Sequence, residues 1–305
     1  MSLTSMIDDK NSPLRRFLTG QLPDAAAVRA AYRATHRSSA PALLPVAGDA
    51  VRPAWHTLGA AIDHRLRLAL RATVARDRSI GQGIRIASTY APALHHVGSA
   101  LLDDLEKLAV THGLDDRSRP VSRSSAVEDR LARLCYAAAW FEEVFRTGRV
   151  WPTTPLGGAH PAFTLDELLA AVPAYAAADI TAVTGRANEG LAGIRETTAP
   201  HEVTLAPTFA GSRGVGGADA DWIAGRLLVD VKATKDPDKL PAQDIYQLAG
   251  YVLLDYPDTH RLDRVGWYHA RTGSLSVWGI GDFFALLGAR EPLQSLRNRT
   301  AALLS

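Results

Sequence analysis

The segment GGADADWIAGRLLVDVKATK, residues 216–235, carries acidic and basic side chains inside what otherwise reads as two β-strands. Side chains alternate between the two faces of a strand, so Asp230 and Lys232 share a face. Asp219 and Asp221 share a face of the preceding strand for the same reason. The short turn AGR predicts a hairpin that brings Asp221 close to Asp230. Two carboxylates that converge beside a lysine are costly unless a cation binds between them, and their oxygens suit Mg²⁺ or Mn²⁺.

A helix is expected after these strands, because PAQDIYQLAGYVLLDY is too long and too rich in Leu and Ala for a strand. Gln247 and Tyr251 are four residues apart and therefore lie on one face of that helix. Gln243 and Tyr246 lie close to the same side. This helix, which comes after the hairpin in the sequence, therefore carries amide and phenol groups on one side.

The order of these parts resembles the PD-(D/E)xK nuclease superfamily: an Asp on one strand, Asp-x-Lys on the next, and Gln-x-x-x-Tyr on the following helix. The segment looks most like the RecB-like exonuclease branch, in which Gln-x-x-x-Tyr is an additional motif. The resemblance covers roughly residues 200–280, and it implies that Gln247 and Tyr251 line the catalytic site and contact the nucleic acid. The proline that is common in the family before the first aspartate is replaced by Ala220.

The resemblance also implies roles for the residues of the hairpin. Asp221 and Asp230 would be metal ligands, joined by Val231, which has only its backbone to offer. Lys232 would position the attacking water and stabilise the charge that develops in the transition state. Asp219 is the rival of Asp221 for the first ligand, because both lie on one face, although Asp221 fits the family's usual distance to Asp-x-Lys better.

RecB-like nucleases carry a further helix upstream, whose histidine joins the metal shell. The segment LGAAIDHRLRLAL resembles it, with Gly59 and His64. The distance along the chain to Asp221 is long, so the intervening helices would form an insertion. Three acidic residues compete with His64 to complete the site: Glu142, Glu143 and Glu189.

Candidates for contact with nucleic acid surround these motifs. Lys235 and Lys239 follow the catalytic strand directly, and the loop that leaves this strand is expected to border the substrate groove. Arg67 lies on the same helical stripe as His64, where an arginine can contact phosphates independently of sequence. Two more candidates are Gln243, on the helix, and Arg213, in the glycine-rich turn GSRGVGG, which lacks the ending of a phosphate-binding P-loop.

The composition sets limits on the class of protein. The chain has 305 residues, of which 47% are apolar and 22% charged, and its net charge of +2 permits an acidic partner without requiring one. The single cysteine, Cys135, rules out an internal disulfide and a four-cysteine cluster, and with it the iron–sulfur branch of the family; this residue is expected in the core. With no secretory signal and no run of about 18 apolar residues, the expected location is cytoplasmic, without a membrane span.

The region before the motifs reads as mainly helical. Helical patterns cover residues 24–37, 57–79, 91–113, 125–148 and 164–195. Capping-box patterns, in which a hydroxyl and a Glu three residues later satisfy backbone N–H groups, open two of them at Ser125 and Thr164. Pro173 interrupts the last pattern, and a proline-broken connection is expected over 38–55.

From about residue 200 the pattern changes to strands, and the last third reads as β–β–β–α–β–β. Together with the resemblance, this implies an α+β fold with a restriction-endonuclease-like core, a mixed central sheet flanked by helices, behind a large helical region. The expected regions are 1–198, mainly helical and including the first-motif helix 57–79; 199–290, the nuclease core; and 291–305, a C-terminal helix.

The expected function is metal-dependent hydrolysis of DNA phosphodiester bonds, with Mg²⁺ or Mn²⁺ as cofactor. Such a nuclease fits DNA repair, mobile-element processing or defence against phage. Two alternatives stay open: a catalytically inactive nuclease-fold protein that binds DNA or acts as a scaffold, and an RNA-directed nuclease on the same core. Because the chain has no recognisable helicase or ATPase motif, energy coupling would require a partner protein.

Overall fold

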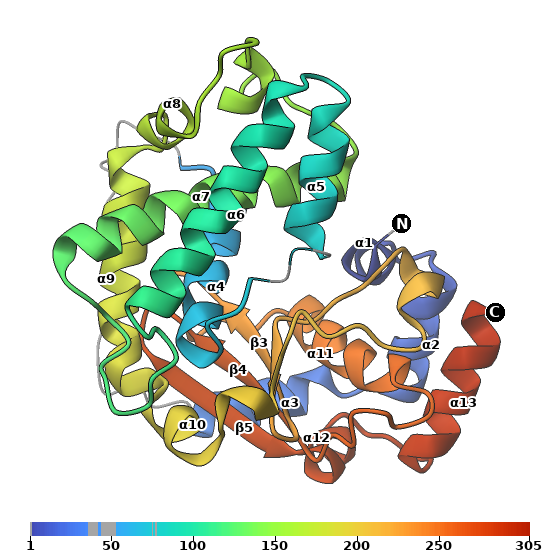
Figure 1. Cartoon of the computed structure of the whole chain (residues 1–305). Helices are drawn as coiled ribbons and strands as arrows, with labels where there is room; N and C mark the ends of the chain where they lie inside the picture. The colour runs from blue at the N-terminus through green and yellow to red at the C-terminus, as the bar shows by residue number, and fades with distance from the viewer. Residues whose placement is uncertain (1, 36–41, 44–52, 75, 77) are drawn as a thin grey trace. The chain divides into compact units, whose positions relative to one another are not determined.

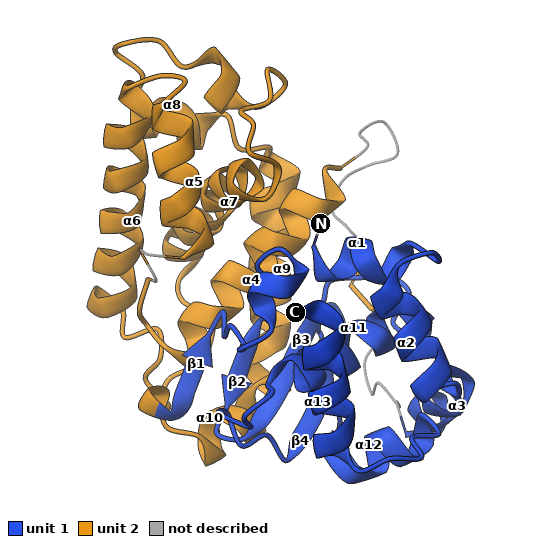
Figure 2. Cartoon of the chain, turned by 90° about the vertical axis from the view of Figure 1, so that its right-hand side faces the viewer, with its two compact units in different colours: residues 1–41, 202–305 blue, residues 42–201 orange. Residues whose placement is uncertain are grey.

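The computed structural model describes residues 2–35, 42–43, 53–74, 76 and 78–305. The chain divides into two compact units (Figure 2): unit 1 comprises residues 1–41 and 202–305, and unit 2 comprises residues 42–201. Within the described residues the structure is a mixed α+β arrangement of thirteen α-helices and one five-stranded sheet. The connection expected over 38–55 falls largely outside the described residues.

Unit 1 is built on the sheet, whose strands lie in the order β1-β2-β3-β4-β5. The strands are β1 (Val203–Leu205), β2 (Trp222–Ala224), β3 (Leu227–Lys232), β4 (Arg264–His269) and β5 (Ser274–Gly279). Neighbouring strands are antiparallel except β3 and β4, which are parallel and joined by the helix α11 (Ala242–Leu254). The order β–β–β–α–β–β that the sequence pattern predicts is confirmed.

The hydrophobic core of unit 1 lies between one face of the sheet and α11 (Figures 1 and 2). Leu228 of β3 is paired with Val265 of β4, and both are fully buried together with Ile245 and Leu248 of α11. Because side chains alternate along a strand, Asp230 shares the face of Leu228. The polar residues of β3 therefore lie on the side of the sheet that α11 covers.

The remaining helices of unit 1 come from both ends of the chain. They are α1 (Leu3–Asp8), α2 (Pro13–Gln21), α3 (Ala25–Thr35), α12 (Ile280–Leu286) and α13 (Leu293–Leu304). Leu3 packs so closely on α11 that a Cβ added at Gly250 would lie 3.3 Å from it, and Tyr246 donates a hydrogen bond to the carbonyl of Leu22. Apolar side chains such as Leu18 are buried here, which is why α1, α2 and α3 belong to unit 1 instead of the helical region expected over 1–198.

Unit 2 consists of helices joined by loops, without a strand among its described residues. Its α-helices are α4 (Trp55–Leu70), α5 (Ser79–Ser88), α6 (Ala93–Thr111), α7 (Ser125–Thr147), α8 (Leu165–Ala170), α9 (Ala174–Gly190) and α10 (Ala192–Thr197). The long helix α7 packs against α4, α5, α6 and α9. Gly83 of α5 touches the backbone of α7, because a Cβ there would meet the carbonyl oxygen of Phe141 at 1.7 Å. Cys135 of α7 is fully buried, as expected.

Two local predictions for unit 2 are wrong. The helix expected over 57–79 ends at Leu70, because Arg71 takes an extended conformation and the N–H of Ala72 donates to the side chain of Asp115 instead of continuing the helix. The capping box expected at Ser125 does not form. The capping box at Thr164 is present, and the break at Pro173 separates α8 from α9.

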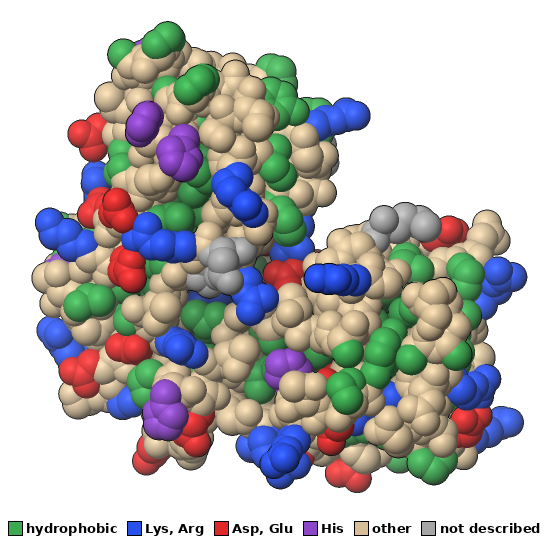
Figure 3. Space-filling model, turned by 45° about the vertical axis from the view of Figure 1, so that its right-hand side comes forward, with side chains coloured by type: hydrophobic (Ala, Val, Ile, Leu, Met, Phe, Trp, Pro, Cys, Tyr) green, Lys and Arg blue, Asp and Glu red, His purple; other side chains and the backbone are tan. Residues whose placement is uncertain are grey.

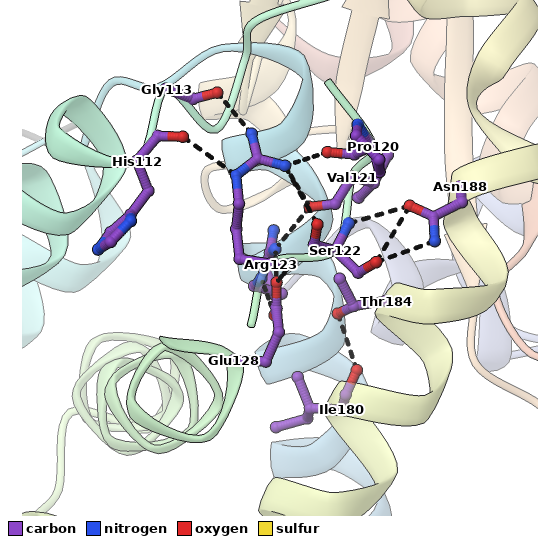
Figure 4. Close-up of polar contacts among 11 residues, drawn as sticks. His112, Gly113, Pro120, Val121, Ser122, Arg123, Glu128, Ile180, Thr184 and Asn188 are labelled. Atoms are coloured by element: carbon purple, nitrogen blue, oxygen red, sulfur yellow. Dashed lines mark hydrogen bonds and ion pairs between the residues drawn. The ribbon is translucent and has the colours of Figure 1, made fainter. Parts of the chain in front are cut away.

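The missing capping box has a physical cause in a buried ion pair. Instead of capping the helix, Glu128 accepts two hydrogen bonds from the guanidinium of Arg65, at 2.9 and 2.6 Å, and one from the backbone N–H of Arg123 at 2.6 Å. Figure 4 shows how Arg123 then reaches the carbonyl groups of the preceding loop, while Asn188 of α9 holds Ser122. The carboxylate of Glu128, on α7, therefore connects this helix to α4 and to the loop that contains Arg123.

Candidate active site

The hairpin of β2 and β3 places Asp221 against Asp230. Ala224 pairs with Leu227, and Gly225 between the strands has a φ of +59°, which favours glycine. Asp221 stands one residue before β2, and its carboxylate accepts a hydrogen bond of 2.5 Å from the backbone N–H of Val231. The predicted approach of the two acidic segments is therefore present in the structure.

Asp230 and Lys232 meet on the face of β3 that α11 covers. Asp230 is 3% exposed, and one of its carboxylate oxygens lies 2.9 Å from Nζ of Lys232. The lysine side chain is 19% exposed, so the charged end of the site keeps some access to solvent. Val231 lies between Asp230 and Lys232 in the sequence. Its backbone N–H donates to Asp221, which leaves its carbonyl oxygen as the atom that could contact a metal ion.

The helix α11 brings a further set of polar groups to the same lysine. Nζ of Lys232 lies 3.3 Å from Oε1 of Gln247, and Nε2 of Gln247 donates to the hydroxyl of Tyr251 at 2.9 Å. The five residues that the resemblance places at the catalytic centre, Asp221, Asp230, Lys232, Gln247 and Tyr251, thus form one connected group within unit 1.

One member of this group was missed by the sequence analysis. Oδ1 of Asp244 lies 2.9 Å from Nζ of Lys232, so the lysine contacts two carboxylates. Asp244 precedes Gln247 by three residues and therefore lies on the same face of α11. The sequence feature that could have identified Asp244 is an acidic residue three positions before Gln-x-x-x-Tyr, on the same helical face.

The electrostatics of the group follow from its burial. Burial raises the pKa of Asp230 to about 7; the charge of Lys232 opposes this rise, and the nearby carboxylate of Asp221 adds to it. Burial alone would lower the pKa of Lys232, but Asp230 and Asp244 outweigh it and hold the pKa above its ordinary value, so the amine stays charged. Burial also raises the pKa of Tyr251. The repulsion between the two carboxylates is the property that a bound cation would relieve.

The structure distinguishes Asp221 from its rival Asp219. Asp219 forms an isolated antiparallel bridge with Thr208. It lies two residues before Asp221, the residue at which the hydrogen bond to β3 is made. Asp221 accepts a hydrogen bond from β3, and its charge raises the pKa of Asp230, whereas the charge of Asp219 contributes to the raised pKa of Tyr251. Asp221 is therefore the better candidate for the first metal ligand.

The residues of unit 1 that are expected to contact nucleic acid come from three separate segments. Lys235 and Lys239 are exposed on the loop that leaves β3, and Lys239 forms an ion pair of 3.1 Å with Asp236. Arg213 is exposed in a short 3₁₀-helix, whereas the side chain of Gln243 donates to Asp8 at 2.9 Å. On the face drawn in Figure 3, Lys and Arg side chains are interspersed with acidic ones instead of forming one continuous basic patch.

The other sequence candidates belong to unit 2. His64 and Glu142, proposed as alternatives, contact each other, with Nε2 of the histidine 2.9 Å from the carboxylate. Burial would raise the pKa of Glu142, but His64 and Arg146 outweigh it and lower the pKa. Arg67 pairs with Asp63 on the same helix. Glu143 on α7 and Glu189 on α9 are half-buried or exposed. The metal role of His64 stays a prediction.

The donors at the hairpin fit a hard divalent cation. Among the described residues, no group of three or more His, Cys, Asp or Glu side chains is arranged to hold a metal ion. Mg²⁺ does not require such a group, because it keeps several waters and binds through one or two carboxylates together with substrate phosphates. Asp221 and Asp230 provide two carboxylates that repel each other, and the backbone of Val231 adjoins them.

Comparisons of the chain with models of protein families, with curated proteins and with solved structures each returned no match. In the part of the chain that the structure describes, no helix has the length and apolar character needed to cross a membrane. What the chain does must therefore be argued from the chemistry of the group formed by β2, β3 and α11.

Proposed function

We propose that this protein is a metal-dependent nuclease that hydrolyses DNA phosphodiester bonds, and that unit 1 is its restriction-endonuclease-like catalytic core. The observation that carries the proposal is the position of Lys232: its ammonium group lies 2.9 Å from Asp230 and 3.3 Å from Gln247, on the hairpin whose other strand presents Asp221. A buried and a half-buried carboxylate beside a lysine, completed by an amide and a phenol from the next helix, suit the hydrolysis of an anionic ester.

Each residue of the group has a task in that reaction. Asp221, Asp230 and the backbone of Val231 would hold Mg²⁺ or Mn²⁺, which, when bound, polarises the phosphate and lowers the pKa of a bound water. Lys232 donates hydrogen bonds toward the attacking water and the phosphate oxygens, where negative charge develops in the transition state. Gln247 keeps the ammonium group in place through its carbonyl oxygen, and Tyr251 fixes the amide of Gln247.

The proposal is tested by cleavage of end-labelled linear and closed circular DNA, both single- and double-stranded, with Mg²⁺, Mn²⁺ or EDTA. We expect metal-dependent loss of substrate by the wild-type protein, and none by Asp230→Asn or Lys232→Ala. Survival of circles would identify an exonuclease, and their linearisation an endonuclease. RNA substrates run in parallel decide the class of nucleic acid.

Two results would end the proposal. If no nucleic acid is cut under any metal condition while DNA still binds in EDTA, the protein is a binding module on this core. If the Lys232→Ala protein cuts as fast as the wild type, the assigned chemistry is wrong even if cleavage occurs. The matched control is Lys235→Ala, which removes the same side chain from an exposed position three residues away and should keep a measurable rate.

A further inference from the structure

Unit 2 carries exposed aromatic side chains that its own core does not need. Tyr90, after the end of α5, is 56% exposed, and Trp151, after the end of α7, is 38% exposed. The helices α5 and α7 pack against each other (Figure 1), and the hydroxyl of Tyr90 donates to the carbonyl of Gly148 at 3.2 Å. The segments that carry the two rings are therefore neighbours in space, although the rings are 61 residues apart in the sequence.

Both rings are exposed, and the ring of Tyr90 is held in place. The backbone N–H of Tyr90 donates to Ala87 at 2.9 Å, and its hydroxyl is fixed on Gly148. For Trp151 it is the backbone that is held: its carbonyl accepts hydrogen bonds from both the N–H and the hydroxyl of Thr154, at 3.0 and 2.8 Å. A ring that is already fixed loses little conformational freedom when something stacks on it, so preorganisation favours binding.

The chain around the two rings is basic. From Ser79 to Leu102, and again from Val144 to Leu165, the sequence has no acidic residue. Arg85 and Arg149 are exposed in these two segments. His95 and His96, on the first turn of α6, add two more exposed rings whose centroids are 5.9 Å apart. Exposed aromatic rings and arginines, in two segments without carboxylates, suit an anionic ligand that also carries flat rings.

We propose that this surface, formed by Tyr90, Trp151, Arg85 and Arg149, binds single-stranded nucleic acid by stacking its bases on the two rings. In a duplex the faces of the bases are covered by their neighbours, whereas an unpaired strand offers them to aromatic side chains. The arginines contact the phosphates, which gives affinity without sequence preference. As a statement about substrate, this inference rests on the proposed function, and it names an unpaired strand as what the nuclease takes.

The test is fluorescence anisotropy of the full-length protein with labelled oligothymidylate, in EDTA so that no cleavage occurs. Tyr90→Ala and Trp151→Ala should each weaken binding of the single strand about tenfold. Tyr90→Phe should weaken it less than Tyr90→Ala does, because a phenylalanine ring still stacks although it loses the hydrogen bond to Gly148. Trp55→Ala, which removes another exposed tryptophan of unit 2, is the matched control and should leave the affinity unchanged. Arg149→Gln should reduce the dependence of binding on salt.

The inference fails if the Tyr90→Ala/Trp151→Ala protein binds the single strand as tightly as the wild type does; the surface then serves another contact, such as one with a protein. It also fails if the double variant loses the same affinity for a duplex of equal length, since stacking on unpaired bases predicts a selective loss. A wild-type protein that cuts nothing but binds single strands through these rings ends the nuclease proposal alone. Cleavage together with unchanged binding by the double variant ends this inference alone.

Discussion

Lys232→Ala should destabilise unit 1 in a way that a divalent cation reverses. The change leaves Asp230, which is 3% exposed, without the cation 2.9 Å from it. Removing one partner of a buried ion pair costs about 3–5 kcal/mol of unfolding free energy. The lower end applies here, about 3 kcal/mol, because the lysine keeps 19% of its side chain exposed and the orphaned carboxylate escapes part of the penalty by binding a proton.

Hydrogen exchange of the peptide that covers β3 measures this effect locally, which suits a chain with two units that need not unfold together. Without metal, the variant should exchange faster by roughly two orders of magnitude, which corresponds to about 3 kcal/mol. Millimolar Mg²⁺ should restore most of the protection, because the ion supplies the missing positive charge. Lys235→Ala is the control. Equal exchange in the two variants, or no response of Lys232→Ala to Mg²⁺, would refute the reasoning.

Three further predictions concern other parts of the structure. Asp244→Asn should slow cleavage about tenfold by loosening Lys232 while leaving the Mg²⁺ dependence unchanged, which steady-state rates across a metal titration would reveal. Glu128→Gln should lower the stability of unit 2 by about 3 kcal/mol, seen as faster hydrogen exchange in α4 and α7, because Arg65 is fully buried and loses its counter-charge. In metal-free protein, the stability of unit 1 should fall as the pH rises from about 4 to about 7 and then level off, because in that window only the folded chain keeps the proton of Asp230. Denaturation midpoints measured against pH would show this slope, and Asp230→Asn should remove it.

The hairpin and the helix that position the candidate site could be predicted from local sequence alone. Alternation along β3 is enough to place Asp230 and Lys232 on one face, and the turn at Gly225 is enough to pair the two strands. These predictions succeed because they depend on neighbours in the sequence. Asp244 was missed because its role depends on the angle at which α11 crosses the sheet, and the sequence does not state that angle.

The errors in the fold arise where contacts distant in sequence override a local pattern. The apolar period of α4 continues past Leu70, but Asp115 captures the backbone N–H of Ala72 and ends the helix there. The pattern at Ser125 would cap α7, but Glu128 pairs with a buried arginine from another helix. The helices α1 and α3 resemble the helices that follow them in sequence, and their packing on α11 places them in unit 1.

The central claim, that the acid next to β3 helps to hold the catalytic metal, is tested most directly by one pair of variants. Asp221→Asn and Asp219→Asn make the same chemical change two residues apart, on the same face of the segment before β2. We predict that the rate of Mg²⁺-dependent DNA cleavage falls to background in Asp221→Asn and stays within a few-fold of wild type in Asp219→Asn. Equal rates for the two variants, or loss of activity in Asp219→Asn alone, would contradict the account.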